Sequence, residues 1–329
     1  MSMCIVDDLF PAPVFVIMVG LPGSGKSTIA SKLAEDNPNT YVFSSDTYRS
    51  KICGNENDQS QNELVFDTLY RDLIHRLMNG KNVILDATNI SRKDRKRALD
   101  RLSRVPLLFR KVAYFVDTNI RDCIDRDACR DRVVGPDVIE KFVRRFEFPQ
   151  YFEGFDEIVI HSKVNQIKNT YDRDKEKFYL EDMDKFEQHN PHHIHTVGTH
   201  CAKLALQIPR TSHYNCIMHE AAWFHDIGKL YTQKFDDKGI AHYYNHDNIG
   251  AYIVACNTDI LFHIEDWDDV YEAIFFINYH MRAHNDFTSL KAQKKYKTLF
   301  GEVRFNKLME FAEYDRIASG TYEEYKEKK

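Results

Sequence analysis

The stretch from Gly20 to Thr28 reads GLPGSGKST and decides the fold of the first half of the chain. It fits the pattern G-x-x-x-x-G-K-[ST], in which a glycine-rich loop joins a strand to a helix. The apolar run Val14–Val19 directly precedes it, and an amphipathic run over residues 26–36 follows it. The stretch therefore predicts a strand, a phosphate-binding loop and a helix, in this order.

The residue types of this loop suit a nucleoside triphosphate with Mg²⁺. Gly23 and Gly25 let the backbone curl so that successive N–H groups face phosphate oxygens, and the helix adds its positive N-terminus. Lys26 can reach the β- and γ-phosphates, and the Ser27 hydroxyl can complete the ligand shell of Mg²⁺. We predict that ATP or another NTP is bound by Gly20, Gly23, Ser24, Gly25, Lys26, Ser27 and Thr28.

Short apolar runs alternate with longer amphipathic runs from Pro13 to about residue 161, which is typical of a parallel sheet with crossover helices. Beyond this point the strand signals fade and the periodicity becomes helical. We predict an α/β domain at 1–165, a linker and first helix at 166–187, and an all-α domain at 188–329. The expected strands are Val14–Val19, Thr40–Phe43, Asn82–Leu85, Leu107–Val116 and Glu157–Ile160, and the expected helices are 26–36, 60–79, 91–104, 119–130, 137–147, 194–207, 213–230 and 268–282.

The composition is that of a folded protein. The 329 residues carry 45 Lys and Arg against 50 Asp and Glu, a net charge of -5, and 43% are hydrophobic. No apolar run approaches the roughly 20 residues of a membrane helix, and no charged-then-apolar leader begins the chain, so we expect no membrane partner. The 7 cysteines are odd in number and form no CxxC pair, which favours a reducing, cytoplasmic compartment.

Charged residues follow the second and third expected strands, at the edge where ligands bind in open α/β sheets. Asp46 could take a hydroxyl proton there, and Arg49 could hold a phosphate with its guanidinium fork. The alternative is that Asp46 caps a helix and Arg49 lies on the surface. Asp86, in the sequence DATN, could orient the Mg²⁺ shell or cap a helix together with Asn89.

Two segments are rich in basic residues. Arg126, Arg130 and Arg132 precede Gly135-Pro136 and could form a lid that neutralises charge on a transferred phosphoryl group, or they could make surface ion pairs. Residues 92–111 hold nine Lys or Arg. This segment is either a solvated helix face or a surface for a polyanion.

The series GSGKST, DTYR (Asp46–Arg49), DATN and R-x-x-x-R resembles the 5′-hydroxyl polynucleotide kinases of phage and bacterial nucleic-acid repair, over about 150 residues. This resemblance implies that Asp46 is the general base on the 5′-hydroxyl and that Arg49 contacts the phosphate on the 3′ side of the acceptor nucleoside. It also implies that Arg130 is the lid arginine, with Arg126 nearby. We accordingly expect the cytoplasm of a bacterium or of a phage-infected host.

The second half is rich in histidine, because 13 of the 15 histidines lie at or after His189. The apolar stretch Ala221–Leu230 reads AAWFHDIGKL, so His225 and Asp226 are adjacent in a helical context. Burying two ionisable neighbours is unfavourable unless a metal or a partner compensates them. On expected helices upstream and downstream lie His200, His246, His280 and Asp315.

The order H, HD, H, H, D resembles the HD-domain phosphohydrolases over about 140 residues. The resemblance implies that one metal is held by His200, His225, Asp226 and Asp315, and that His246 and His280 help to hold a second metal bridged by Asp226. It places Lys229 beside the substrate phosphate. Imidazole and carboxylate ligands suit Mn, Fe, Co, Ni or Zn. The other histidines, including His192, His193, His195, His213 and His284, are expected near the ligands or in structural roles.

Together the halves indicate a bifunctional enzyme of nucleic-acid end repair. The first domain would phosphorylate the 5′-hydroxyl of RNA or DNA, and the second would remove a 2′-, 3′- or 2′,3′-cyclic phosphate. These products are the ends that a ligase needs, so we expect cooperation with a nucleic-acid ligase. The alternatives are a small-molecule or nucleotide kinase joined to an HD nucleotide phosphohydrolase, and a nucleotide-sensing regulatory protein with an inert HD site.

Overall fold

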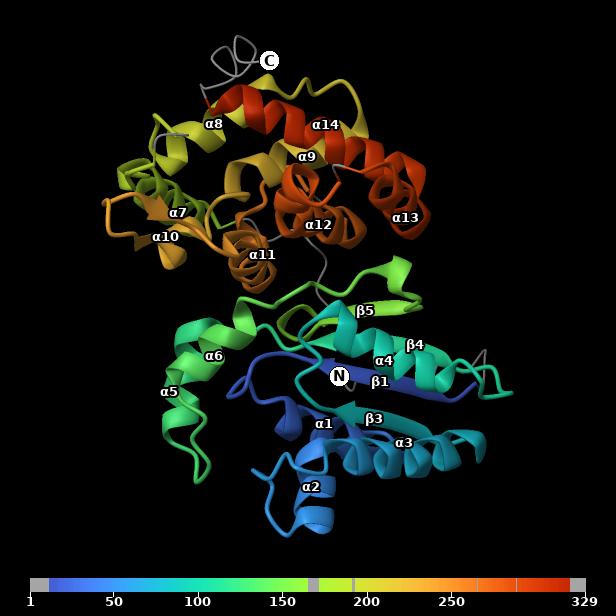
Figure 1. Cartoon of the computed structure of the whole chain (residues 1–329). Coiled ribbons are helices and arrows are strands. Elements are labelled where there is room, and N and C mark those ends of the chain that lie inside the picture. The colour runs from blue at the N-terminus through green and yellow to red at the C-terminus, as the bar shows by residue number, and fades with distance from the viewer. Residues whose placement is uncertain (1–11, 165–171, 191–192, 265, 288, 320–329) are drawn as a thin grey trace. The chain divides into compact units, whose positions relative to one another are not determined.

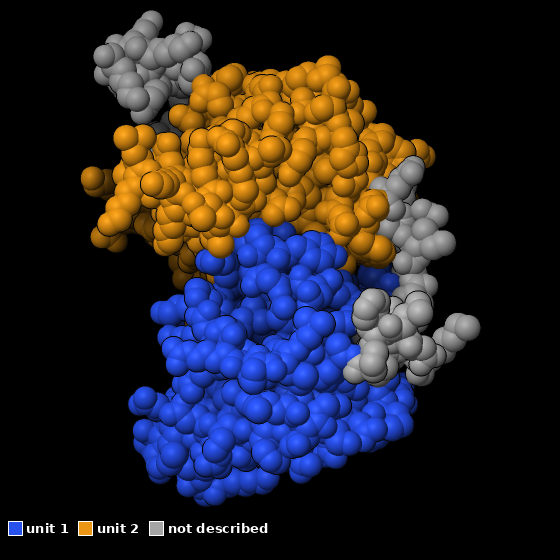
Figure 2. Space-filling model, turned by 90° about the vertical axis from the view of Figure 1, so that its right-hand side faces the viewer, with its two compact units in different colours: residues 1–142, 149–166 blue, residues 143–148, 167–329 orange. Residues whose placement is uncertain are grey.

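A computed structural model describes residues 12–164, 172–190, 193–264, 266–287 and 289–319 of the chain (Figure 1). The chain divides into two compact units, coloured separately in Figure 2. Unit 1 comprises residues 1–142 and 149–166, and unit 2 comprises residues 143–148 and 167–329. None of the described helices combines the length and the apolar character that crossing a membrane requires.

Unit 1 is built on a five-stranded parallel sheet with the strand order β2-β3-β1-β4-β5. All six side chains of β1 are buried, because helices cover both faces of the sheet. The predicted parallel α/β architecture is therefore confirmed. The strands are β1 (Val14–Val19), β2 (Thr40–Ser44), β3 (Asn82–Asp86), β4 (Arg110–Phe115) and β5 (Glu157–Ile160).

The crossover helices divide between the two faces of the sheet. Alternate residues of β1, namely Val14, Val16 and Met18, share a core with Ala30 and Leu33 of α1. The connection from β1 to β2, which contains α1, runs in one direction along the sheet, and those from β2 to β3 and from β3 to β4 run in the opposite direction. Right-handed crossovers therefore place α3 and α4 on the face opposite to α1. The helices are α1 (Lys26–Asp36), α2 (Ser45–Cys53), α3 (Asn62–Met78), α4 (Arg92–Leu102), α5 (Ile120–Ala128) and α6 (Pro136–Val143).

Helices α3 and α4 lie side by side (Figure 1), with Arg101 of α4 paired to Asp67 of α3. A buried ion pair also fixes α4 to the segment before β5. Arg95 donates from Nε and Nη2 to the two carboxylate oxygens of Glu153 at 2.9 and 2.7 Å, and its Nη1 donates to the Asn89 carbonyl at 3.1 Å. The side chains of Arg95 and Glu153 are 0% and 2% exposed. The pair thus fixes α4 behind the loop that carries the DATN sequence.

Unit 2 is helical apart from a short hairpin. Its central helix is α12 (Trp267–Asn285), whose residues 270–280 are all buried, as expected for a helix surrounded by others. Helix α12 packs against α9, α11 and α14. The other elements are α7 (Arg173–Lys185), α8 (Val197–Gln207), α9 (His213–Phe224), α10 (Lys229–Thr232), β6 (Lys234–Phe235), β7 (Ala241–His242), α11 (His246–Cys256), α13 (Leu290–Phe300) and α14 (Glu302–Ala318).

Residues 143–148 belong to unit 2 although they follow helix α6 of unit 1. Asn278 of α12 holds this segment like a neighbouring strand, since its side chain accepts from the Phe148 N–H at 2.8 Å and donates to the Phe146 carbonyl at 3.2 Å. Glu147 pairs with Arg282 of α12 at 2.6 Å. The phenyl rings of Phe146 and Phe148 are fully buried.

Four details differ from the sequence-based expectations. Strand β4 begins at Arg110 and not at Leu107, because the apolar Leu107 and Leu108 lie in an exposed loop. The helix expected at 137–147 ends at Val143, since the chain turns at 144–145 and the buried residues 146–148 are not helical. The helix expected at 213–230 breaks after Phe224. Helices α2 and α13 and the β6–β7 hairpin were not expected, whereas α11 and α14 were expected at His246 and Asp315 without bounds.

We predict that Glu153→Gln lowers the free energy of unfolding by about 3 kcal/mol or more, because it leaves the buried guanidinium of Arg95 without its counter-charge. Asp100→Asn is the matched control: it removes the carboxylate paired with Lys96 on the exposed side of the same helix. That change should stay within about 0.5 kcal/mol. Urea unfolding followed by circular dichroism measures both, and equal midpoints for the two variants would contradict the prediction.

Candidate active sites

The phosphate-binding loop joins β1 to α1 with a backbone that only glycine fits. Gly23 has φ 78°, and a Cβ atom there would lie 2.2 Å from the carbonyl oxygen of Cys123. Gly25 is the N-cap of α1 in the left-handed conformation, with φ 94°. The Gly20 N–H donates to the Thr88 carbonyl at 3.2 Å, which ties the loop to the residues after β3. The sequence GLPGSGKST is therefore explained by backbone geometry.

Lys26 lies inside the curl of this loop. Its Nζ donates to the Leu21 carbonyl at 2.7 Å and contacts Ser24 Oγ at 3.5 Å. Burial lowers the pKa of Lys26 to about 8, and the nearby carboxylate of Asp86 partly opposes this effect. A bound phosphate would add negative charge beside the ammonium group and favour its protonated form. The loop thus holds a buried cation where a triphosphate would supply the missing counter-charge.

A cavity of about 520 Å³ opens over the loop. The phosphate loop and the carboxyl ends of β2 and β3 line it, together with Arg126, Arg130 and Arg132. Apolar side chains from α3, from the loop before α6 and from α6 form further walls. The lining includes Gly23, Gly25, Lys26, Ser27, Thr28, Asp46, Arg49, Gln59, Phe66, Asp86, Thr88, Arg126, Arg130, Arg132, Val134, Val138 and Phe142.

The acceptor residues predicted after β2 lie in the first turns of α2. Arg49 Nη1 contacts Asp46 Oδ1 at 2.8 Å, and Arg132 Nη1 contacts Asp46 Oδ2 at 3.0 Å. Arg49 is only 7% exposed and also donates to Asn62 at 3.2 Å. Ser44, and not Asp46, occupies the N-cap position of α2. The alternative of a capping Asp46 with a surface Arg49 is therefore wrong.

The other predicted kinase residues surround the same cavity. Asp86 is the last residue of β3, and the N-cap of the next helix, α4, is Ser91. Neither Asp86 nor Asn89 caps that helix. The Arg126 guanidinium approaches Gly25 of the loop. Arg130 lies 3.9 Å from the buried Asp127, which accepts the N–H groups of residues 134 and 135 and so shapes the turn before α6. The pairing of Arg132 with Asp46 was not foreseen, because the sequence gives no sign that these two residues meet.

The basic segment at 92–111 fits its solvated interpretation. At least five of its nine cations make ion pairs within unit 1, and the Arg95 pair is completely buried. Lys96, Arg101, Arg110 and Lys111 pair with Asp100, Asp67, Glu157 and Asp156, in that order. Because carboxylates already neutralise most of this segment, it offers little charge to a polyanion.

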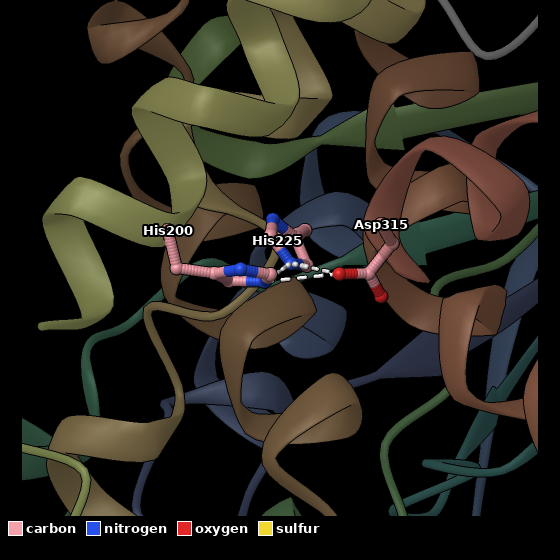
Figure 3. Close-up of side chains that lie close together, drawn as sticks. All are labelled: His200, His225 and Asp315. Carbon is pink, nitrogen blue, oxygen red and sulfur yellow. Dashed lines mark hydrogen bonds and ion pairs between the residues drawn. The ribbon is translucent and has the colours of Figure 1, made fainter. Parts of the chain in front are cut away.

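In unit 2 the predicted histidines and aspartates converge on one buried centre. Figure 3 shows His200 of α8, His225 after α9 and Asp315 of α14 pointing toward one another. His200 Nε2 lies 2.9 Å from Asp315 Oδ1 and 3.2 Å from His225 Nε2. Asp226 Oδ2 is 3.4 Å from the Nε2 atoms of both histidines. Helices α8 and α14 and the turn after α9 therefore supply a group of mutually close metal-ligand atoms.

The second oxygen of Asp226 faces a second histidine pair. Asp226 Oδ1 lies 3.0 Å from His246 Nε2 and 3.7 Å from His280 Nε2. These two nitrogens are 3.2 Å apart. One carboxylate thus contacts two groups of ligands through different oxygens, which is the geometry of a bridging ligand between two metals.

The hydrogen bonds of the imidazoles fit metal ligation. The Nδ1 atoms of His225, His246 and His280 contact the carbonyls of Ala222, Tyr243 and Ile277 at 2.9, 2.7 and 2.8 Å. Carbonyls only accept, so each Nδ1 donates its proton, and Nε2 is the ring nitrogen that faces Asp226 and could ligate a metal. Imidazole nitrogens and carboxylate oxygens that converge in this way fit a divalent metal.

Asp226 is a buried carboxylate with charged neighbours. Its side chain is buried, and burial alone would raise its pKa; Lys229 at 2.7 Å and His225 nevertheless hold the pKa well below its ordinary value. Lys229 is 3% exposed and also donates to Gln188 Oε1 at 2.8 Å. His284 contacts the outer oxygen of Asp315 at 2.8 Å. Gln188 thus orients Lys229, and His284 orients Asp315.

Two further side chains lie close to the centre. Cys201 Sγ is 3.5 Å from His225 Nδ1, an arrangement that the sequence did not indicate. The His193 ring lies 5.6 Å from that of His200, and burial together with Lys229 lowers its pKa to about 3. His192, expected in this surrounding, lies outside the described residues.

A close backbone approach positions His246 on Asp226. A Cβ atom on Gly228 would lie 2.0 Å from the His246 carbonyl oxygen, and one on Gly250 would lie 3.3 Å from the Gly228 nitrogen. The two glycines thus let α11 pack directly on the turn of the HDIGK sequence. A cavity of about 180 Å³ opens on the centre, lined by His193, Asp226, Lys229, His246, Met281, His284, Asp315, Arg316 and Ser319.

Comparisons with known proteins give a family match and matches to solved structures. A family described as AAA domain matches residues 15–149. A solved structure of the Pnkp1/Rnl/Hen1 complex is 27% identical over 35% of this chain and 38% of that chain, with a TM-score of 0.32. A second, of the Pnkp1/Rnl/Hen1 RNA repair complex, is 26% identical over 40% and 43%, with a TM-score of 0.37. This chain therefore spans less than half the length of either. No curated protein matches it.

The family match, the glycine-rich loop and the five parallel strands together identify a P-loop, kinase-like α/β domain in the first half of the chain. Such a domain implies the use of a nucleotide with Mg²⁺. The second half is helical and contains His and Asp groups that could hold metal ions.

We predict that the full chain binds about two divalent ions at this centre and that Asp226→Asn reduces both occupancies, because both ligand groups share this carboxylate. His246→Gln should remove one ion and keep the other. His242→Gln, a change in the exposed hairpin, should bind like the unaltered protein. Elemental analysis after dialysis against Mn²⁺ measures the content; equal metal in the Asp226 and His242 variants would refute the shared site.

Proposed function

We propose that the chain is a bifunctional enzyme of nucleic-acid end repair. The N-terminal domain, residues 1–165, transfers the γ-phosphoryl group of an NTP to the 5′-hydroxyl of RNA or DNA. The HD domain, residues 188–329, follows a linker and helix at 166–187 and removes a 2′-, 3′- or 2′,3′-cyclic phosphate. The products carry a 5′-phosphate and a 3′-hydroxyl, so a nucleic-acid ligase in the same cytoplasm would complete the repair.

One observation carries the kinase assignment: a carboxylate and a buried arginine face the phosphate loop across a single cavity. Asp46 and Arg49 form this pair, 2.8 Å apart, and Lys26 lies in the loop below them. An NTP hydrolase needs a positioned water, whereas a kinase needs a base and an anchor for its acceptor. The Asp46–Arg49 pair meets the second requirement.

Each of these residues has a role in the proposed phosphoryl transfer. Arg49 binds the phosphate on the 3′ side of the acceptor nucleoside with its fork and brings the 5′-hydroxyl to Asp46. Asp46 takes the hydroxyl proton as the oxygen attacks the γ-phosphorus, and the bond from this phosphorus to the β–γ bridging oxygen breaks to release NDP. Lys26, Arg126 and Arg130 neutralise the charge that develops on the phosphoryl oxygens. When bound, Mg²⁺ supplies further neutralisation, and Ser27 and Asp86 stand where they would hold it.

The hydrolase assignment is supported by the shared Asp226 and by the small cavity beside it, which two cations and two carboxylates line. Lys229 and Arg316 line this cavity and offer charge to a phosphate ester. Metals bound by the two histidine groups would supply an activated water and stabilise the leaving oxygen. The chain's own part is to orient the ester with Lys229 and to fix the ligands through Gln188, His284 and the backbone carbonyls.

Asp46→Asn should lower kcat for transfer of label from γ-labelled ATP to a 5′-hydroxyl oligonucleotide by about 10²-fold or more, because the general base is lost. The KM for ATP should change little, since Asp46 contacts the acceptor. Lys26→Ala should weaken the use of ATP itself. Asp67→Asn, on the exposed surface of α3, is the control and should remain fully active. Normal transfer by Asp46→Asn would exclude this residue as the base, and no transfer by the unaltered protein would exclude the kinase.

Asp226→Asn should abolish the Mn²⁺-dependent release of phosphate from oligonucleotides with 2′-, 3′- or cyclic phosphate ends, while its kinase rate stays unchanged. Asp46→Asn should show the reverse pattern, because the two reactions use separate residues. Parallel assays of both variants on both substrates measure this. Retained hydrolysis in Asp226→Asn would place the hydrolytic chemistry elsewhere. No hydrolysis by the unaltered protein would exclude the hydrolase.

A further inference from the structure

A groove on the outer side of helix α2 has no role in the functions described above. It lies in unit 1 between the edge strand β2, helix α2 and helix α3, and it has a volume of about 460 Å³. Tyr41, Tyr48, Arg71, Asp72 and Arg76 contribute to its lining. We propose that this groove binds the single strand of the nucleic acid downstream of the 5′-hydroxyl end, an inference that rests on the proposed kinase function.

Cations lie over the two tyrosine rings of the groove. The Arg76 guanidinium lies over the Tyr41 ring, 4.5 Å from its centroid, and Lys51 Nζ lies 5.4 Å from the centroid of Tyr48. The Tyr48 hydroxyl donates to Asp72 at 3.0 Å, which fixes its ring. Tyrosines interleaved with cations are the combination by which proteins bind single-stranded nucleic acids, since bases stack on the rings and phosphates pair with the cations.

The charge of the groove selects an anion. Arg71 and Arg76 line it, and Lys51 lies over the ring of Tyr48. Asp72, the one carboxylate of its lining, is engaged by the Tyr48 hydroxyl and by Arg71 at 3.2 Å. Within the described part of the chain, neither Lys51 nor Arg76 pairs with a carboxylate. This differs from the basic segment at 92–111, whose cations are mostly neutralised. The groove therefore retains the uncompensated positive charge that phosphate contacts require.

Helix α2 lies between the groove and the catalytic cavity and contributes residues to both. Asp46 and Arg49 face the cavity, whereas Tyr48 lines the groove. Successive residues of a helix turn by 100°, so these positions lie on different sides of α2. Thr47 is exposed between them. A strand whose 5′ end lies at Asp46 can leave the cavity across this first turn and continue along the exposed edge of β2.

The test compares a long and a minimal acceptor. A 12-nucleotide 5′-hydroxyl oligonucleotide would reach the groove, whereas a nucleoside 3′-monophosphate would occupy only the cavity. For the double variant Lys51→Gln/Arg76→Gln we expect KM for the 12-mer to rise about tenfold, and KM for ATP and for the monophosphate to stay unchanged. Losing two phosphate contacts should reduce the slope of log affinity against log salt by about 1.4, at ~0.7 per contact for single strands. Lys93→Gln/Arg97→Gln on α4 is the charge-matched control and should match the unaltered protein.

The outcomes separate this inference from the kinase assignment. An unchanged KM for the 12-mer, or an equal loss for both acceptors, overturns the groove while leaving the kinase standing. If the unaltered protein phosphorylates neither acceptor, the kinase proposal fails. Fluorescence anisotropy of a labelled 12-mer without ATP then decides the groove alone. Weaker binding by the Lys51/Arg76 variant than by the Lys93/Arg97 variant supports the groove, and equal binding by the two overturns it.

Discussion

The need to compensate buried charge controls how both units are built. Arg95 is completely buried in unit 1 and would be strongly destabilising without the two oxygens of Glu153 and the carbonyl of Asn89. Lys26 is buried with carbonyl partners and a nearby aspartate, and its lowered pKa shows that this compensation is incomplete. In unit 2, Asp226 meets a lysine and four histidines. The structural pair is thus satisfied within the chain, whereas the two sites have places for a phosphate or a metal to complete the compensation.

Glycine sets the distances at which these charges meet. Gly23 brings the phosphate loop against the Cys123 carbonyl, and Gly228 brings the HD turn against the carbonyl of His246. A methyl group at either position would collide with backbone and not with a flexible side chain, so the neighbouring segment would have to move. At Gly228 that movement would draw His246 away from Asp226. Both sites are therefore positioned by backbone contact as much as by the polar side chains themselves.

The sequence predicted the bounds of elements, and which candidate site residues meet, where a local pattern determines them. Strand β1 and helix α1 have the predicted bounds, because an apolar run and the glycine loop determine them locally. His200, His246, His280 and Asp315 were singled out by their order along the chain. The helices bring the three histidines to Asp226 and bring Asp315 to His200. The contacts of Arg132 with Asp46 and of Cys201 with His225 were missed, since they join residues 86 and 24 positions apart without any local pattern. The end of α6 was misplaced for a similar reason: Phe146 follows Phe142 at a helical spacing, but it belongs to unit 2 and contacts Asn278 of α12.

The arginines beside Asp46 explain how the proposed kinase could couple its base to its acceptor. Without an acceptor, both oxygens of Asp46 are engaged, one by Arg49 and one by Arg132. A phosphate is the stronger competitor for a guanidinium fork, since it offers more charge and more acceptor oxygens than a single carboxylate oxygen. An acceptor phosphate that draws Arg49 to itself would release Oδ1 of Asp46, while Arg132 continues to hold Oδ2 and to orient the group. The carboxylate then becomes free to accept a proton at the moment when the hydroxyl arrives. Water, which brings no phosphate to Arg49, would not release the base, and this favours transfer to the nucleic acid over hydrolysis of the NTP.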